Sequence, residues 1–163
     1  MVTIKKSQIN DIYNILNPIQ LNKITNPVIR KMILKLVLEL PKQAEAFRNM
    51  IDDVRKKLFS EFTETDVNAF QSKVMEIDRA VATNEREKAF NTEMETKEAY
   101  PELYTAYTNF ISSINELSAE TVELPVESVE MDDFIDALIG LDVDITAKEL
   151  NILNPLFKNE SAE

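Results

Sequence analysis

The side chains best suited to chemistry in this 163-residue chain are its carboxylates, which occur in short clusters. The segment Asp142-Val143-Asp144-Ile145-Thr146 begins like a calcium-binding loop, in which acidic residues alternate along the chain. Such a loop needs glycine at its sixth position and an acidic residue at its twelfth, but Ala147 and Leu153 occupy these places. The match to a calcium loop therefore fails.

A second acidic cluster consists of Asp132, Asp133 and Asp136. These residues suit the first turn of a helix, where negative charge is favoured, and this role explains them without a metal ion. Two carboxylates can also catalyse glycoside hydrolysis, but among 29 Asp and Glu residues some pair always occurs by chance. We expect neither a metal site nor a catalytic residue from these clusters.

Three residue types that enzymes depend on are absent or nearly so. The chain has no histidine, the commonest general base and metal ligand, and no cysteine for a disulfide or a thiolate site. Its one glycine, Gly140, cannot supply a phosphate-binding loop or a dinucleotide fingerprint. The composition predicts a protein that is not an enzyme and that binds no cofactor.

The positive charges gather in the first part of the chain. Residues 1–60 hold 11 Lys and Arg against 5 Asp and Glu, a net charge of +6, whereas residues 61–163 hold 7 against 24, a net charge of −17. This asymmetry fits either two halves that neutralise each other by packing together or a surface for a charged partner. The seven cations of residues 31–57 are interleaved with acidic residues, and the one aromatic residue in this range, Phe47, belongs to the apolar side of the segment. We therefore expect a solvated helix face and no nucleic-acid partner.

The elements that must position these groups are mostly helices. Asn26-Pro27 is a strong helix start, a capping side chain followed by proline in the first turn. The apolar residues that follow recur at steps of three and four with a coiled-coil-like rhythm and keep their phase across Pro41, which predicts one long kinked helix over about 27–62. They are Ile29, Ile33, Leu36, Leu40, Ala44, Phe47, Ile51, Val54 and Leu58.

Other periodic segments predict helices over about 7–17, 65–82 and 101–118. The segment after residue 82 is nearly all polar; it either continues as a solvated helix to 99, supported by the pair Glu93 and Lys97, or is mobile. The pattern changes after residue 120. Alternating apolar residues predict strands at 122–126 and 141–145, a short helix over 132–139 ends at Gly140, and Thr146 with Glu149 forms a capping box for a last helix.

The predicted fold class is mainly α: a long kinked helix in an elongated helical bundle or hairpin, with a small β element near the C-terminus. We expect a helical region over 1–120 and a small α+β region over 121–163 packed on it. The long apolar stripe exceeds what a thin pair of helices can bury, which favours a homo-oligomer, and a dimer in particular. The tyrosines of the 101–118 helix fit either the edge of a core or an interface. The candidate interface residues are Ile33, Leu36, Leu40, Phe47, Ile51, Tyr100, Tyr104 and Tyr107.

Four segments of the sequence, taken in order, resemble those of a group of small uncharacterised proteins encoded by tailed bacteriophages. The resemblance covers most of the chain except about 63–99, which in the other proteins looks more like a loop. It implies a phage setting, and it brings no active-site residue to this chain. The segments are Ile12-Tyr13-Asn14-Ile15-Leu16, the alternation of apolar and charged residues over Ile29–Leu58, the residues from Ile114 to Leu124, and Ile145-Thr146-Ala147-Lys148-Glu149-Leu150.

These observations lead to an expected function. We expect a non-catalytic protein–protein interaction protein of a bacteriophage, cytoplasmic in the host or part of the virion, with a structural or assembly role. The alternatives are an accessory inhibitor of a host enzyme or defence system that uses the acidic half, and a protein that sequesters a small molecule. No segment approaches the roughly 20 apolar residues of a membrane span, so we expect no membrane partner.

Overall fold

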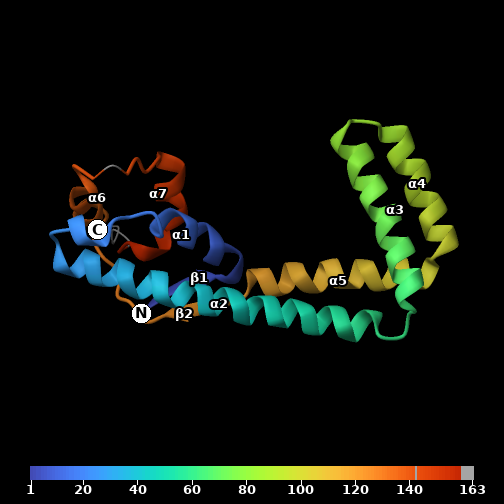
Figure 1. The fold of residues 1–163 in the computed structure, drawn as a ribbon, viewed down its shortest axis with the longest axis horizontal. Coiled ribbons are helices and arrows are strands. Elements are labelled where there is room, and N and C mark those ends of the chain that lie inside the picture. Colours follow the sequence, from blue (N-terminus) through green and yellow to red (C-terminus); the bar gives the residue numbers. More distant parts are fainter. Residues whose placement is uncertain (142, 159–163) are drawn as a thin grey trace, which may run out of the picture. The chain divides into compact units, whose positions relative to one another are not determined.

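The chain folds mainly into α-helices, as the sequence predicts, in a computed structural model that describes residues 1–141 and 143–158 (Figure 1). It divides into two compact units. Unit 1 is Met1–Asn49 with Leu117–Glu163, and unit 2 is Met50–Glu116. The sequence suggested a boundary at residue 120, and unit 1 contains residues from both sides of it. Residues 142 and 159–163 of the predicted region 121–163 lie outside the described part of the chain.

The longest element is helix α2, which spans Pro27–Phe59 and runs unbroken through Pro41. The prediction of one helix, not two, is confirmed, although α2 ends three residues before the predicted end at residue 62. The predicted cap is also present, because Asn26 Oδ1 accepts hydrogen bonds from the backbone N–H groups of Val28 at 3.0 Å and Ile29 at 3.3 Å.

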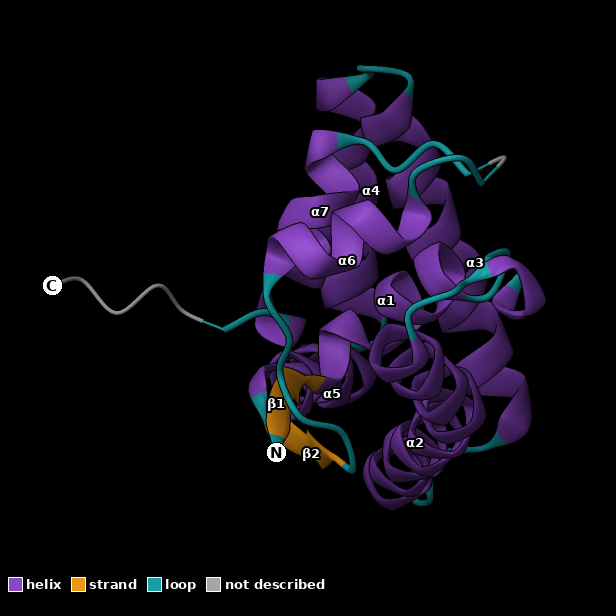
Figure 2. Cartoon of the chain, turned by 90° about the vertical axis from the view of Figure 1, so that its left-hand side faces the viewer, coloured by secondary structure: helices purple, strands orange, loops and turns teal. Residues whose placement is uncertain are grey.

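Unit 1 contains a two-stranded antiparallel sheet. Strand β1 (Val2–Lys5) pairs with β2 (Thr121–Leu124), with Val2 opposite Leu124 (Figure 2). The sequence predicted β2 but missed β1, although Val2 and Ile4 alternate with polar residues and are both buried. The strand predicted over 141–145 is wrong for the described residues there, because Leu141 and residues 143–145 form a loop whose apolar side chains pack against the core.

Three short helices complete unit 1: α1 (Ile9–Leu16), α6 (Met131–Leu138) and α7 (Ala147–Leu153). The chain leaves α6 through Gly140, whose φ of +82° is the left-handed conformation that glycine adopts without strain. The capping box of α7 is confirmed, since Thr146 Oγ1 accepts the N–H of Glu149 at 3.2 Å and Glu149 Oε2 accepts the N–H of Thr146 at 2.7 Å.

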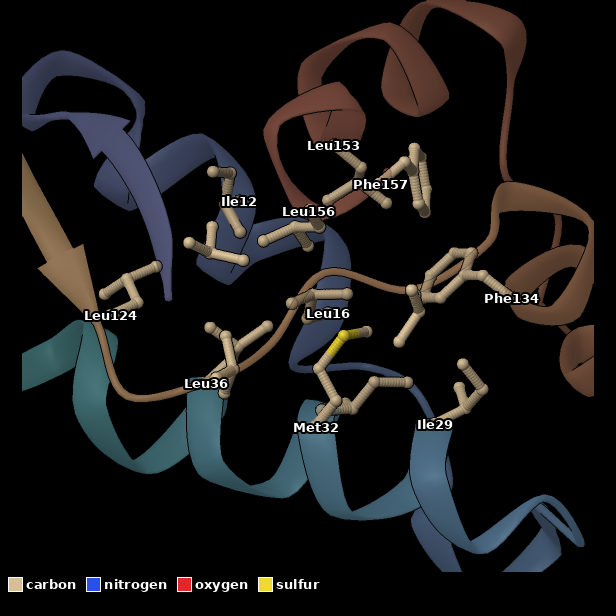
Figure 3. Close-up of a cluster of buried hydrophobic side chains, with 14 of the residues drawn as sticks. Ile12, Leu16, Ile29, Met32, Leu36, Leu124, Phe134, Leu153, Leu156 and Phe157 are labelled. Carbon is tan, nitrogen blue, oxygen red and sulfur yellow. The ribbon is translucent and has the colours of Figure 1, made fainter. Parts of the chain in front are cut away.

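The core of unit 1 forms where the first half of α2 meets residues from both ends of the chain. Side chains of α1 and α2 point toward those of β2, α6 and the C-terminal residues, and Phe134 lies against Phe157 with ring centroids 5.3 Å apart (Figure 3). Each such side chain stabilises the fold by about 1.5–3 kcal/mol when fully buried. From α2 the core takes Ile29, Met32, Ile33, Leu36 and Leu40.

Unit 2 contains the end of α2, then α3 (Glu64–Ala82), α4 (Arg86–Ala99) and most of α5 (Pro101–Ala119). Helices α3 and α4 form an antiparallel pair (Figure 1). The chain turns between them at Asn84, which has a φ of 60°. The N–H of Glu85 bonds to the carbonyl of Ala80 at 2.8 Å and that of Asn84 to Val81 at 3.0 Å, a Schellman cap with asparagine in the glycine position. The polar segment after residue 82 is therefore helical from Arg86 to Ala99, as one of the two alternatives had it, but as a separate helix and not as a continuation of α3.

Candidate functional site

The candidate site lies in unit 2, beside a cluster of aromatic rings around Phe70. Phe70 of α3 is only 1% exposed. Tyr100, between α4 and α5, and Tyr104 and Tyr107 of α5 present their rings to Phe70 at centroid distances of 6.2, 6.3 and 5.6 Å. The ring planes are steeply inclined, the edge-to-face geometry that aromatic pairs prefer. These rings fix the position of α5 on α3.

Two adjoining hollows open beside this cluster, and together they form what we call the aromatic groove. The smaller has a volume of about 240 Å³ and the larger about 470 Å³, and Arg55, Phe59 and Gln71 line both. The walls of the groove are mainly apolar and aromatic, and they come from α2, the turn that follows it, α3 and α5. The other lining residues are Lys56, Ser60, Phe62, Glu64, Val67, Phe70, Val74, Met75, Tyr107 and Phe110.

Local structure explains why the groove is open. Helix α2 ends at Phe59, and α3 begins only at Glu64, capped by Thr63, whose Oγ1 accepts the N–H of Asp66 at 3.2 Å. Phe59 packs edge to face on Phe110 of α5, with ring centroids 5.9 Å apart. Helices α2 and α5 therefore meet through large rings, and the space between this pair and α3 is left unfilled.

The α2 side of the groove is basic. Arg55, Lys56 and Lys57 lie in the last turns of α2, where cations interact favourably with the carboxyl end of the helix dipole. None of the three makes an ion pair with another residue in the described part of the chain. Arg55 lines both hollows, so its guanidinium can meet an incoming carboxylate at the edge of an apolar surface.

Helix α4 shows an unusual distribution of its side chains. Its buried residues are the small Ala89, Thr92 and Thr96, and Thr96 satisfies its hydroxyl by bonding to the carbonyl of Thr92 at 2.6 Å. Its large apolar residues face the other way, with Phe90 62% and Met94 42% exposed. Small residues let α4 approach α3 closely, whereas Phe90 and Met94 contribute apolar surface that the described chain does not bury.

A polar cluster links α4 to α5. The carboxylate of Glu93 accepts hydrogen bonds from Lys97 at 2.7 Å and from the hydroxyl of Tyr104 at 2.9 Å, which lowers the pKa of Glu93, chiefly through Lys97. Burial, together with the nearby Glu93 carboxylate, raises the pKa of Tyr104. At neutral pH the tyrosine stays protonated and the glutamate ionised, so the cluster serves to hold the two helices together.

The structure separates the eight candidate interface residues into two groups. Ile33, Leu36 and Leu40 are fully buried in the core of unit 1, so the prediction that they form an intermolecular surface is wrong: residues of the same chain cover them. Phe47 and Ile51, further along α2, are partly exposed. The tyrosines Tyr100, Tyr104 and Tyr107 are partly buried around Phe70, which is the core-edge role, and Tyr107 also lines the aromatic groove.

Sequence reasoning missed several groove residues. Phe59 falls one position outside the apolar stripe of α2, which ended at Leu58, and Phe62 was placed at the end of that helix. Met75 is outside the buried face of α3 and 63% exposed. The only sequence signal was the density of phenylalanine and cations between residues 55 and 62, because the distance between those residues and α5 could not be known.

The acidic clusters do not converge. Within residues 1–141 and 143–158, no group of three acidic, histidine or cysteine side chains has metal-binding geometry. Asp132 and Asp133 lie in the first turn of α6, as the sequence predicted. Asp142, the first residue of the calcium-loop-like segment, lies outside the described residues. No helix in the described part combines the length and apolarity needed to cross a bilayer.

Comparison with known proteins adds no relative. No protein-family model matches the chain, and neither a curated protein nor a solved structure shows significant similarity to it.

Proposed function

We propose that this chain is a non-catalytic protein–protein interaction protein, and that its aromatic groove receives an apolar side chain of a partner segment carrying carboxylates nearby. The observation that carries the proposal is the combination of an aromatic hollow with Arg55 at its edge. Aromatic residues and arginine are enriched where proteins bind one another, and charged lysine and glutamate are depleted there.

The chemistry of the groove defines the partner. A large apolar side chain that enters it gains about 1.5–3 kcal/mol from burial. A carboxylate one helical turn away on the partner would reach Arg55 and Lys56, and an arginine can bind a carboxylate through two parallel hydrogen bonds. An amphipathic partner helix with acidic residues beside its apolar face meets both requirements.

The proposed setting is a bacteriophage, on the basis of the sequence resemblance, with a structural or assembly role. The runner-up is inhibition of a host enzyme or defence system. Sequestration of a small molecule is the third candidate, since the hollows have the mainly apolar and aromatic lining with a few polar side chains, Arg55 and Gln71 among them, that small-molecule sites have.

Affinity capture with matched variants tests the proposal. The tagged chain and four variants are incubated with lysates of the cells that make it. Met75→Glu and Arg55→Glu alter the groove, whereas Val81→Glu and Arg79→Glu change an equally exposed apolar residue and an arginine of α3 that do not line it.

We expect one dominant protein that is lost with both groove variants and retained with both controls. Capsid or tail proteins as this partner would favour the assembly role, and a host enzyme would favour the inhibitor. Capture that is unchanged by the groove variants, or no capture at all, would contradict the proposal.

A further inference from the structure

Helix α2 has a second apolar face, opposite the one that the core of unit 1 buries. Val28 is 63%, Leu34 45% and Leu38 60% exposed. At 100° per residue these three share one side of the helix with three lysines; the one acidic residue of 27–42, Glu39, lies at the margin of this side and pairs with Lys42 at 3.2 Å. We call this surface the basic face; it consists of Val28, Lys31, Leu34, Lys35, Leu38 and Lys42.

A hollow of about 430 Å³ adjoins the basic face. Pro27, Val28, Met32, Val126 and Val129 provide most of its apolar lining, while Lys31, Lys35, Glu127 and Ser128 complete it. Lys35 donates a hydrogen bond to the carbonyl of Pro125 at 3.3 Å, which holds the β2 end of the hollow against α2. Lys31 is exposed and makes no ion pair with any residue that the structure describes.

Helix α6 presents the complementary surface. Met131 and Ile135 lie one turn apart on α6 and are 44% and 37% exposed, and Ile139, directly after the last helical residue Leu138, is 72% exposed. Asp132 and Asp136 flank this stripe on the same side of the helix, and neither forms an ion pair in the described part of the chain. We call Met131, Asp132, Ile135, Asp136 and Ile139 the acidic face.

We propose that a second copy of this chain docks its acidic face on the basic face of the first, with an apolar residue of its α6 stripe in the hollow beside Val28. Both surfaces belong to unit 1, so every copy carries both halves of the contact. A two-fold axis would form the contact twice and close a dimer. This inference does not depend on the aromatic groove, which lies in unit 2.

Charge decides between the possible occupants of the basic face. A basic amphipathic helix can also lie on an anionic membrane. The net charge of −11 opposes the approach of the whole chain to such a surface and to a second copy alike, so the local match between the two faces decides. A second copy brings two carboxylates and two apolar side chains on α6, and Ile139 directly after it, which match the lysines and the apolar residues of the basic face.

Sedimentation equilibrium of the full chain at several micromolar concentrations tests the docking. We expect a concentration-dependent dimer that Leu38→Glu weakens by at least about tenfold, the effect of roughly 1.4 kcal/mol. Val81→Glu, a matched change at an equally exposed site of unit 2, should leave the dimer intact. A monomer at every concentration, or equal weakening by both variants, would overturn the inference.

Charge reversal identifies the partner surface. Lys31→Glu and Asp136→Lys should each weaken the dimer, because both contacts then place like charges together. A mixture of the two variants should associate more tightly than either alone, because both contacts of the mixed dimer pair opposite charges, one natively and one with the signs exchanged. Failure of the mixture to recover would show that α6 is not the partner. Co-sedimentation of the monomer with phosphatidylglycerol vesicles, abolished by Leu38→Glu, would assign the basic face to a membrane and overturn the inference.

Discussion

The hydroxyl group of Tyr104 donates a hydrogen bond to Glu93 over 2.9 Å and so joins α5 to α4. Lys97 binds the same carboxylate at 2.7 Å and lies over the Tyr104 ring, 4.9 Å from its centroid. Helix α4 has few large buried side chains, so this polar contact is one of the means by which it is held in unit 2. Its strength depends on the charge of Glu93.

Acid should remove the contribution of Glu93. Folding lowers the pKa of this glutamate below 4.5, so the unfolded chain binds its proton more readily. The stabilisation is therefore present above about pH 4.5 and is lost as the pH falls through the folded-state value. Urea unfolding of the wild type and of Glu93→Gln should differ at pH 7 and converge toward pH 3. The exposed Glu95→Gln on the same helix is the control, and a pH-independent difference for Glu93→Gln would contradict the prediction.

Two leucines of α2 separate its buried face from its exposed one. Leu36 is 0% exposed and Leu38 is 60% exposed. Leu36→Ala should lower the free energy of unfolding by about 2–5 kcal/mol, because it leaves a cavity in the core. Leu38→Ala should change it by less than about 0.5 kcal/mol in dilute, monomeric protein. Urea denaturation followed by circular dichroism measures both, and equal losses would show that the two faces were assigned wrongly.

The turn between α3 and α4 gives a test of backbone conformation. Asn84 has a φ of 60°, a left-handed conformation that costs most residues with a side chain about 1–2 kcal/mol. Asn84→Ala should destabilise unit 2 by about 1 kcal/mol, whereas Asn84→Gly should be neutral within about 0.5 kcal/mol. If thermal or urea unfolding gives the same stability for both variants, the left-handed turn is not formed in solution.

Local signals in the sequence predicted much of the fold. Asn26 marked the start of α2, Gly140 the end of α6, and Thr146 with Glu149 the start of α7, because caps act within one turn of the helix. The stripe through Ile33 and Leu40 correctly marked the buried face of α2. The residues that cover that face could not be predicted from the sequence, since they come from the two ends of the chain and are far from α2 in sequence.

The elements that were missed, or left open as α4 was, have weaker local signals. Strand β1 is four residues long and pairs with β2 more than a hundred residues later, so only its alternation of Val2 and Ile4 marked it. The helical period of α4 was obscured because its buried residues are small and its large ones exposed. The aromatic groove joins the end of α2 to α3 and α5, a juxtaposition that depends on tertiary structure.

Photo-crosslinking from within the aromatic groove tests the central claim most directly. p-Benzoylphenylalanine is placed at Met75, which lines the groove, or at Val81, which is equally exposed on α3 but does not line it. After irradiation in the producing cells, the crosslinked peptides are sequenced by mass spectrometry. We predict one protein partner captured from position 75 only, through a segment with a large apolar residue within one helical turn of Asp or Glu, and its loss when Arg55→Glu is added. The same captured proteins from both positions, or capture that Arg55→Glu does not diminish, would contradict the account.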